Sequence, residues 1–215
     1  MKRENKKRFY AAGCMLAAFV LWTAAVCVVD VRSIGPMGSG VGFAALNSFV
    51  HHLTGVHMGL YTLTDWLSIL PLGLVLGFAG LGLAQWVRRR SLFRVDFSLF
   101  ALGGFYALVM AAFLFFEVFV VNYRPVLIEG VLEASYPSST TMLVLCVMPT
   151  AMMQLRERMK RGALRKGVLM AMGAFTAFMV MGRLLSGVHW ISDIVGGLLL
   201  SAGLVTLYSA VTKRK

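Results

Sequence analysis

Long runs of apolar residues, separated by shorter polar connections, set the pattern of the 215-residue sequence. A helix needs about 20 mostly apolar residues to cross the hydrocarbon core of a membrane, and all but one of the runs reach about that length. We therefore expect an all-α, polytopic membrane protein in one domain (residues 1–215), with six transmembrane helices at Phe9–Val31, Trp66–Val87, Phe97–Val121, Thr141–Leu155, Gly167–Leu185 and Trp190–Val211. The run from Thr141 is short, so its helix should begin nearer Tyr136 or lie partly inside the protein.

The connection Arg32–Asp65, between the first two runs, is the longest one. It opens with the turn-forming segment SIGPMGSGVG. Apolar residues at helical spacing follow, and they predict a short amphipathic helix in the outer membrane interface: Phe43, Leu46, Phe49, Val50 and Leu53. His51, His52 and His57 lie on or beside this helix. They are either interfacial polar residues or groups at the mouth of a site.

The composition excludes an ordinary soluble globular protein, because 59% of the residues are hydrophobic, 14% are charged and the mean hydropathy is +0.78. A net charge of +12 is compatible with a nucleic-acid partner, but the distribution of that charge argues against one. All 21 Lys and Arg residues except Arg32, Arg124 and Arg183 fall in four segments that alternating helices bring to one side. The positive-inside rule then predicts a multi-pass cell-membrane protein with both termini in the cytoplasm and no nucleic-acid partner.

Ionisable residues gather on the opposite, extracytoplasmic side. The segment RLLSGVHWISD holds Arg183, His189 and Asp193, six and four residues apart. Arg183 and Arg124 can bind a phosphate through forked guanidinium donors, and the PSST segment (residues 137–140) can open a helix whose free N–H groups hold an anion. Asp193 lies one helical turn from His189 and can orient its imidazole. The pattern predicts phosphate-ester chemistry with His189 as the nucleophile.

These residues resemble the signature of the type 2 phosphatidic acid phosphatase (PAP2) superfamily, which reads Lys-x6-Arg-Pro, Pro-Ser-Gly-His and Ser-Arg-x5-His-x3-Asp. The three motifs match in order at Arg124 and Pro125, at Pro137 and Ser138, and at Arg183, His189 and Asp193. The resemblance covers residues 117–193. Membrane members of the family have six helices, which agrees with the expected number of spans.

The resemblance implies a role for each matching residue. His189 would attack phosphorus and form a phosphohistidine, and Asp193 would orient it. The phosphate would be held by Arg124, Arg183, Ser138, Ser139 and Thr140. Four positions depart from the signature: Ser139 stands where the family has Gly, and Gly182 where it has Ser. The other two carry chemistry, because Glu117 stands where the family has Lys and Thr140 stands where it has the His that protonates the leaving oxygen. A carboxylate at Glu117 would repel a phosphate unless it were paired, for instance with Arg124, or faced elsewhere.

The function that follows is a membrane lipid phosphatase or pyrophosphatase acting at the extracytoplasmic face, with no cofactor. A lipid phosphate or pyrophosphate would be the substrate, and surrounding membrane lipids would be the other partners. The candidate site lacks a cluster of carboxylates suited to Mg²⁺, so we expect a metal-independent enzyme. Two alternatives stay open: a phosphotransferase on the same scaffold, and a weak or inactive relative that binds phospholipid or a partner, which the residues Glu117 and Thr140 make credible.

Overall fold

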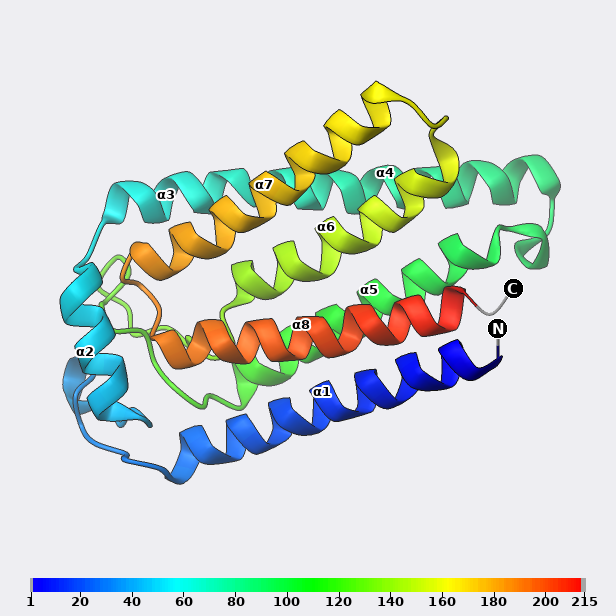
Figure 1. The fold of residues 1–215 in the computed structure, drawn as a ribbon. Coiled ribbons are helices and arrows are strands. Elements are labelled where there is room, and N and C mark those ends of the chain that lie inside the picture. Colours follow the sequence, from blue (N-terminus) through cyan, green and yellow to red (C-terminus); the bar gives the residue numbers. More distant parts are fainter. Residues whose placement is uncertain (1, 214–215) are drawn as a thin grey trace.

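Helices form most of the computed structural model, which describes residues 2–213 (Figure 1). They are α1 (Lys2–Val28), α2 (Ala44–Thr54), α3 (Met58–Leu67), α4 (Ile69–Arg89), α5 (Phe97–Val118), α6 (Ser139–Arg158), α7 (Ala163–Leu185) and α8 (Ile191–Thr212), with short 3-10 helices η1 (Pro36–Gly38) and η2 (Leu92–Arg94). Within the described residues no β-strand forms, and three isolated bridges are the only β contacts. The expected all-α class is confirmed.

Within residues 2–213, five segments are long and apolar enough to cross a membrane: Arg3–Val28, Met58–Arg89, Phe97–Val118, Ala163–Leu185 and Ile191–Thr212. The chain is therefore a multi-pass membrane protein. Helix α6 occupies the place of the expected fourth span, and it lies between α7 and α8 in Figure 1. Half of its 20 residues are buried, so its surroundings are largely protein, and it does not need a fully apolar surface. The count of six spans stays a prediction, as does the interfacial position of α2.

The second membrane segment begins earlier than the sequence indicated. We expected it at Trp66, but helix starts at Met58, and α3 continues into α4 with only Ser68 between them, itself in helical geometry. The sequence analysis placed Thr64 in the connection Arg32–Asp65 between the first two spans. The Thr64 hydroxyl instead donates to the carbonyl groups of Leu60 and Tyr61 within the helix, which removes the cost of its polarity.

Other helix ends differ from expectation by a few residues. Helix α1 ends at Val28 rather than Val31, and the chain turns at Asp30, whose carboxylate accepts a hydrogen bond from the Ala45 N–H at 2.8 Å. Helix α5 ends at Val118 rather than Val121. In both cases the apolar residues continue past the helix into the outer connections. A prediction from hydrophobicity alone therefore placed each helix end too late.

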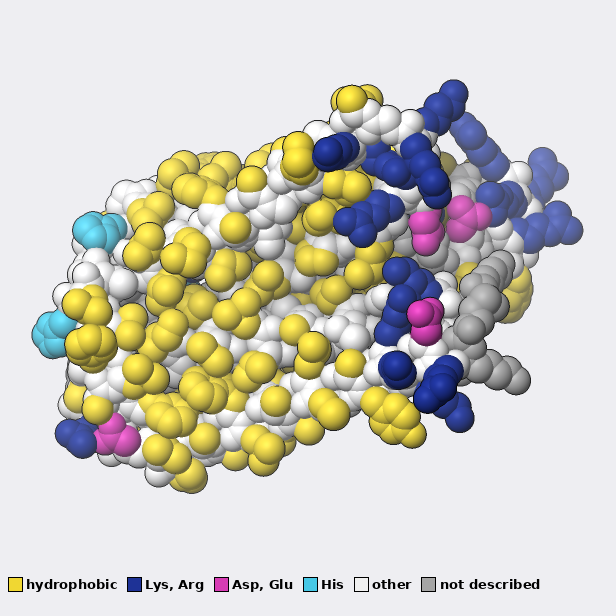
Figure 2. Space-filling model, in the orientation of Figure 1, with side chains coloured by type: hydrophobic (Ala, Val, Ile, Leu, Met, Phe, Trp, Pro, Cys, Tyr) yellow, Lys and Arg dark blue, Asp and Glu magenta, His cyan; other side chains and the backbone are white. Residues whose placement is uncertain are grey.

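Charge is divided between the two ends of the bundle. The described N- and C-terminal ends lie together at one end, beside the α4–α5 and α6–α7 connections (Figure 1). Lys and Arg side chains crowd that end in Figure 2, whereas the visible histidines lie at the other end. Of the four basic segments, Arg214 and Lys215 lie outside the described residues. The prediction that both termini face the cytoplasm depends on this gathering of Lys and Arg side chains at one end.

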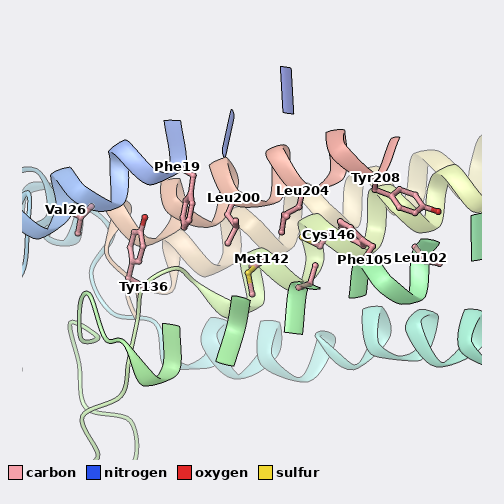
Figure 3. Packing of buried hydrophobic residues seen from close by; sticks show 11 residues of the cluster. Phe19, Val26, Leu102, Phe105, Tyr136, Met142, Cys146, Leu200, Leu204 and Tyr208 are labelled. Carbon is pink, nitrogen blue, oxygen red and sulfur yellow. The ribbon is translucent and has the colours of Figure 1, made fainter. Parts of the chain in front are cut away.

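The main packed core joins α1, α5, α6 and α8 (Figure 3). Its residues include Phe19, Phe105, Met142, Leu200 and Tyr208. Helix α1 runs along α8, where a Cβ atom at Gly203 would stand 2.7 Å from the Leu16 side chain. Since lipid tails are as apolar as these side chains, close van der Waals packing rather than water exclusion holds the helices together.

The core also fixes the outer loop before α6. Tyr136 stacks on Phe19 with 6.3 Å between ring centroids, and its hydroxyl lies 2.6 Å from the Thr23 hydroxyl. Its ring leaves no room for a Cβ atom at Gly196 of α8. The loop that begins the PSST segment is therefore anchored to α1 and α8 at the end of the bundle opposite the basic residues.

Candidate functional site

His189 lies in the short loop between α7 and α8. The turn is made by Gly187, which has φ +68° and whose Cβ position would fall 1.8 Å from the Gly55 carbonyl oxygen, so only glycine fits. Its carbonyl group lies 3.1 Å from Nε2 of His51, and the N–H of His57 donates to the Ser186 carbonyl. The junction of α2 and α3 thus holds the loop that presents His189.

A serine connects His189 with Asp193. Oγ of Ser135 lies 2.9 Å from Nδ1 of His189 and 2.5 Å from Oδ2 of Asp193. The hydroxyl has one proton, which goes to the carboxylate, so Nδ1 of His189 must be the donor to Oγ. This tautomer leaves a lone pair on Nε2 of His189. Asp193 was expected to orient the imidazole. Ser135 bridges the two side chains, and the orienting role stays a prediction.

Asp193 is fully buried, and several donors satisfy its carboxylate. Besides Ser135, these are the amide of Asn122 at 3.1 Å, the N–H of Trp190 at 3.0 Å and the hydroxyl of Ser192 at 3.3 Å. Hydrogen bonds of this kind favour the charged form of a buried carboxylate. Asp193 also sits in the first turn of α8, where the helix dipole favours negative charge.

Two arginines lie beside His189. Burial is the main reason that the pKa of His189 is well below its usual value, and the positive charges of Arg124 and Arg183 lower it further. Nε2 of His189, Nη1 of Arg124 and Nε of Arg183 are all buried without a hydrogen-bond partner among the described residues. Buried polar groups usually find partners. A neutral imidazole nitrogen and unpaired guanidinium donors at one place form a site for an anion that can accept their hydrogen bonds.

Helix α3 and a loop carboxylate hold the arginines. The Tyr61 ring lies 4.8 Å from Cζ of Arg183 and 5.7 Å from Cζ of Arg124, centroid to atom, so one aromatic face attracts both cations. Arg183 also lies 3.8 Å from the Asp65 carboxylate. Nε of Arg124 lies 3.0 Å from the Glu133 carboxylate, as an ion pair that lacks hydrogen-bond geometry.

The PSST segment forms the start of α6, as the anion-site hypothesis requires. Ser138 is the residue before the helix, and Ser139 and Thr140 are its first two residues. The first-turn N–H groups of a helix have no partner within it. The Ser138 N–H donates to the Asp193 carbonyl at 3.2 Å, which ties this segment to α8. Oγ of Ser138 is buried with no partner in the described structure.

The remaining candidate residues form no ion pair with Arg124 or Arg183 within the described part of the chain. Glu117 is exposed near the end of α5, and it makes no ion pair within the described part of the chain. The suggested partner, Arg124, is paired with Glu133 instead. His51 contacts the Gly187 carbonyl and His57 contacts the Thr54 carbonyl, so both bind backbone groups. His52 is exposed.

The sequence analysis missed four residues of the site: Ser135, Asn122, Tyr61 and Glu133. Ser135 and Asn122 face each other in the loop, since the Ser135 N–H donates to the Asn122 carbonyl. Asn122 is an isolated polar residue after an apolar run, which was the available signal, whereas Ser135 lies in the polar segment EASYPSST. Metal-ligand clusters of three or more His, Cys, Asp or Glu do not occur within residues 2–213.

Comparison with known proteins fits this geometry. The family model described as the PAP2 superfamily matches residues 104–215. The fold is similar to the crystal structure of the first transmembrane PAP2 type phosphatidylglycerolphosphate phosphatase from Bacillus subtilis, with a TM-score of 0.65, 17% sequence identity, and coverage of 95% of this chain and 97% of that chain. At this identity the similarity establishes a shared fold. No curated protein matches the chain.

Proposed function

The chain belongs to the PAP2 superfamily, and from that premise we propose that it is a membrane lipid phosphatase or pyrophosphatase. It hydrolyses a lipid phosphate at the extracytoplasmic face through a phosphohistidine intermediate. One observation carries the proposal: Nε2 of His189 is buried and unpaired, while Nδ1 of the same ring is held through Ser135 by Asp193. A neutral imidazole fixed in this way is an activated nucleophile.

In the proposed first step, the lone pair on Nε2 of His189 attacks phosphorus, and the bond from phosphorus to the leaving oxygen breaks. The electron pair of that bond stays on the leaving oxygen. Arg124, Arg183 and the N–H groups at the start of α6 bind the phosphoryl oxygens. Positive charge develops on the imidazole, and the Ser135–Asp193 link stabilises it.

In the second step, water attacks the phosphohistidine. The P–N bond breaks, inorganic phosphate leaves, and the lone pair returns to Nε2 of His189. Every group in both steps belongs to the chain, the substrate or water, so the reaction needs no metal ion. Metal independence is part of the proposal.

The residue at position 140 bears on the substrate. A threonine cannot act as a general acid near neutral pH, and this loss forfeits a factor of about 10²–10⁴ for a leaving group that needs a proton. A lipid pyrophosphate releases a phosphate, which bears negative charge readily, whereas a monoester releases an alkoxide. Thr140 at the start of α6 therefore favours pyrophosphate substrates.

The departures from the signature at Glu117 and Thr140 support a second candidate, a weak or inactive relative that binds phospholipid. With Glu117 exposed on α5, the site lacks the positive charge of the family's lysine. Two arginines and a helix start still provide an anion site. This candidate keeps lipid-phosphate binding and predicts the absence of phosphate release.

The decisive experiment measures phosphate release by purified protein from phosphatidic acid, phosphatidylglycerol phosphate, diacylglycerol pyrophosphate and undecaprenyl pyrophosphate. His189→Ala should abolish release, and His52→Ala is a matched control because His52 is exposed. Acid-labile phosphate on His189 in a rapid quench would identify the intermediate. Transfer of the phosphate to an added alcohol would indicate the phosphotransferase. No release from any substrate, with binding retained, would favour the inactive relative.

A further inference from the structure

A cavity lies between α4 and α5, far along the bundle from His189. It has a volume of about 560 Å³, within the range of pockets that hold small ligands. Its lining is apolar along both helices and η2, and includes Phe78, Gly82, Trp86, Leu92 and Gly103. We call this cavity the α4–α5 groove.

The residues that line the groove are almost all apolar. Tyr106 is the residue of its lining that carries a hydroxyl, and that group lies 3.2 Å from the Thr150 hydroxyl on α6. A Cβ atom at Gly82 would meet no atom within 4 Å, so the groove is open space at this point. The walls therefore suit a hydrocarbon chain.

Arginines lie next in the chain to residues that line one end of the groove. Leu92 and Val95 line it, and Arg94 stands between them in the chain. Arg88, Arg90 and Arg94 are exposed and form no ion pair within the described residues, whereas Arg89 is paired with Asp96 at 2.9 Å. Three free cations beside an apolar channel complement a molecule with an acyl chain and an anionic headgroup.

The loop at this end also has the character of a membrane-interface segment. Phe93 is 101% exposed and Trp86 is 44% exposed. Aromatic side chains of this kind sit at the level of the lipid headgroups. The arginines therefore lie at headgroup height, with the groove extending below them into the hydrocarbon layer.

We propose that the α4–α5 groove binds one anionic phospholipid from the leaflet at the basic end of the bundle. One acyl chain lies between α4 and α5, and Arg88, Arg90 and Arg94 hold the headgroup phosphate. Basic pockets between membrane helices on the cytoplasmic side bind anionic headgroups by the same physics. The site is distinct from that of His189, which lies at the other end of the bundle, and it does not depend on the proposed enzymatic function.

The test is native mass spectrometry of the full-length protein in detergent, titrated with dioleoyl phosphatidylglycerol or dioleoyl phosphatidylcholine. Phosphatidylglycerol should bind first and more tightly. Gly82→Leu should remove this first binding event because its side chain fills the groove. Gly80→Leu is the matched control, since Gly80 also has open space around a Cβ atom but does not line the groove.

The charge component has its own control. Arg90→Gln with Arg94→Gln should weaken phosphatidylglycerol binding by about fivefold for each arginine, while Lys160→Gln with Arg161→Gln removes equal charge from another loop at the same end and should leave binding unchanged. Circular dichroism and size-exclusion elution check the fold of each variant. Equal affinity for both lipids, or wild-type binding by Gly82→Leu, would each overturn the proposal.

Discussion

Ser135→Ala should test the central link of the site. The substitution removes the oxygen that lies 2.9 Å from Nδ1 of His189 and 2.5 Å from Oδ2 of Asp193. Asp193 keeps its bonds to Asn122, Trp190 and Ser192, so the fold around it should survive. His189 loses the group that fixes its tautomer and ring orientation.

The magnitude follows from the bond that is lost. A hydrogen bond with a charged partner contributes about 1.5–3 kcal/mol, and about 1.4 kcal/mol corresponds to a factor of ten in rate. The rate of phosphohistidine formation should therefore fall about 10- to 100-fold. The KM should change little, because Arg124 and Arg183 still bind the phosphate.

Single-turnover quench with the best substrate from the screen measures the rate of phosphohistidine formation. Ser201→Ala is the matched control, since Ser201 is also buried but lies on α8 against Met142. Ser135→Thr, which keeps a hydroxyl, should recover part of the rate. The KM separates positioning from simple loss of structure, because a site that has lost its structure would also lose phosphate binding. A Ser135→Ala enzyme as fast as Ser201→Ala would refute the reasoning.

Four further outcomes are expected. The pKa of His189 lies well below 6.5, so the nucleophile stays neutral as the pH falls through 6.5; the acid limb of kcat/KM should lie below that value, and Arg124→Gln should raise it. Thr140→His should raise kcat/KM for a monoester more than for the matched pyrophosphate, and equal gains would contradict the leaving-group argument. In a chain without its native cysteines, Val131→Cys, exposed in the outer loop, should react with an impermeant maleimide added outside intact cells; reaction from the cytoplasm alone would reverse the orientation. Phosphate release should persist in EDTA, whereas a loss restored by Mg²⁺ would disprove metal independence.

Local spacing made part of the site predictable. Arg183, His189 and Asp193 fall within one helix end, one turn and one helix start, so their order along the chain brings them close in space. Ser135 is 54 positions from His189 and 58 from Asp193. A contact at that separation depends on how the loop before α6 packs on α8. The sequence carried no sign of that packing.

The partner of Arg124 shows the same limit. Glu117 was considered because it occupies a motif position, but position in a motif does not fix the direction of a side chain. The loop after Arg124 turns back at Glu129 and Gly130, both with positive φ, and the Arg124 N–H donates to the Glu133 carbonyl at 3.0 Å. This hairpin-like return places the Glu133 carboxylate next to the guanidinium. The glycine at position 130 is compatible with a turn and could have been used to predict one. The ion pair between Arg124 and Glu133 could not be predicted from the sequence.

The way in which the two arginines are held explains how a buried cationic site can exist without substrate. The side chains of Arg183 and Arg124 are 1% and 9% exposed, but those of Asp65 and Glu133 are 57% and 40% exposed. Leaving a buried guanidinium unpaired costs about 3–5 kcal/mol, whereas water can hydrate the released carboxylates of Asp65 and Glu133. A phosphate that enters the site can therefore replace both carboxylates at low cost, since each can turn to water. We expect Tyr61, whose ring lies against both arginines, to keep their guanidinium groups in place while their anionic partners exchange.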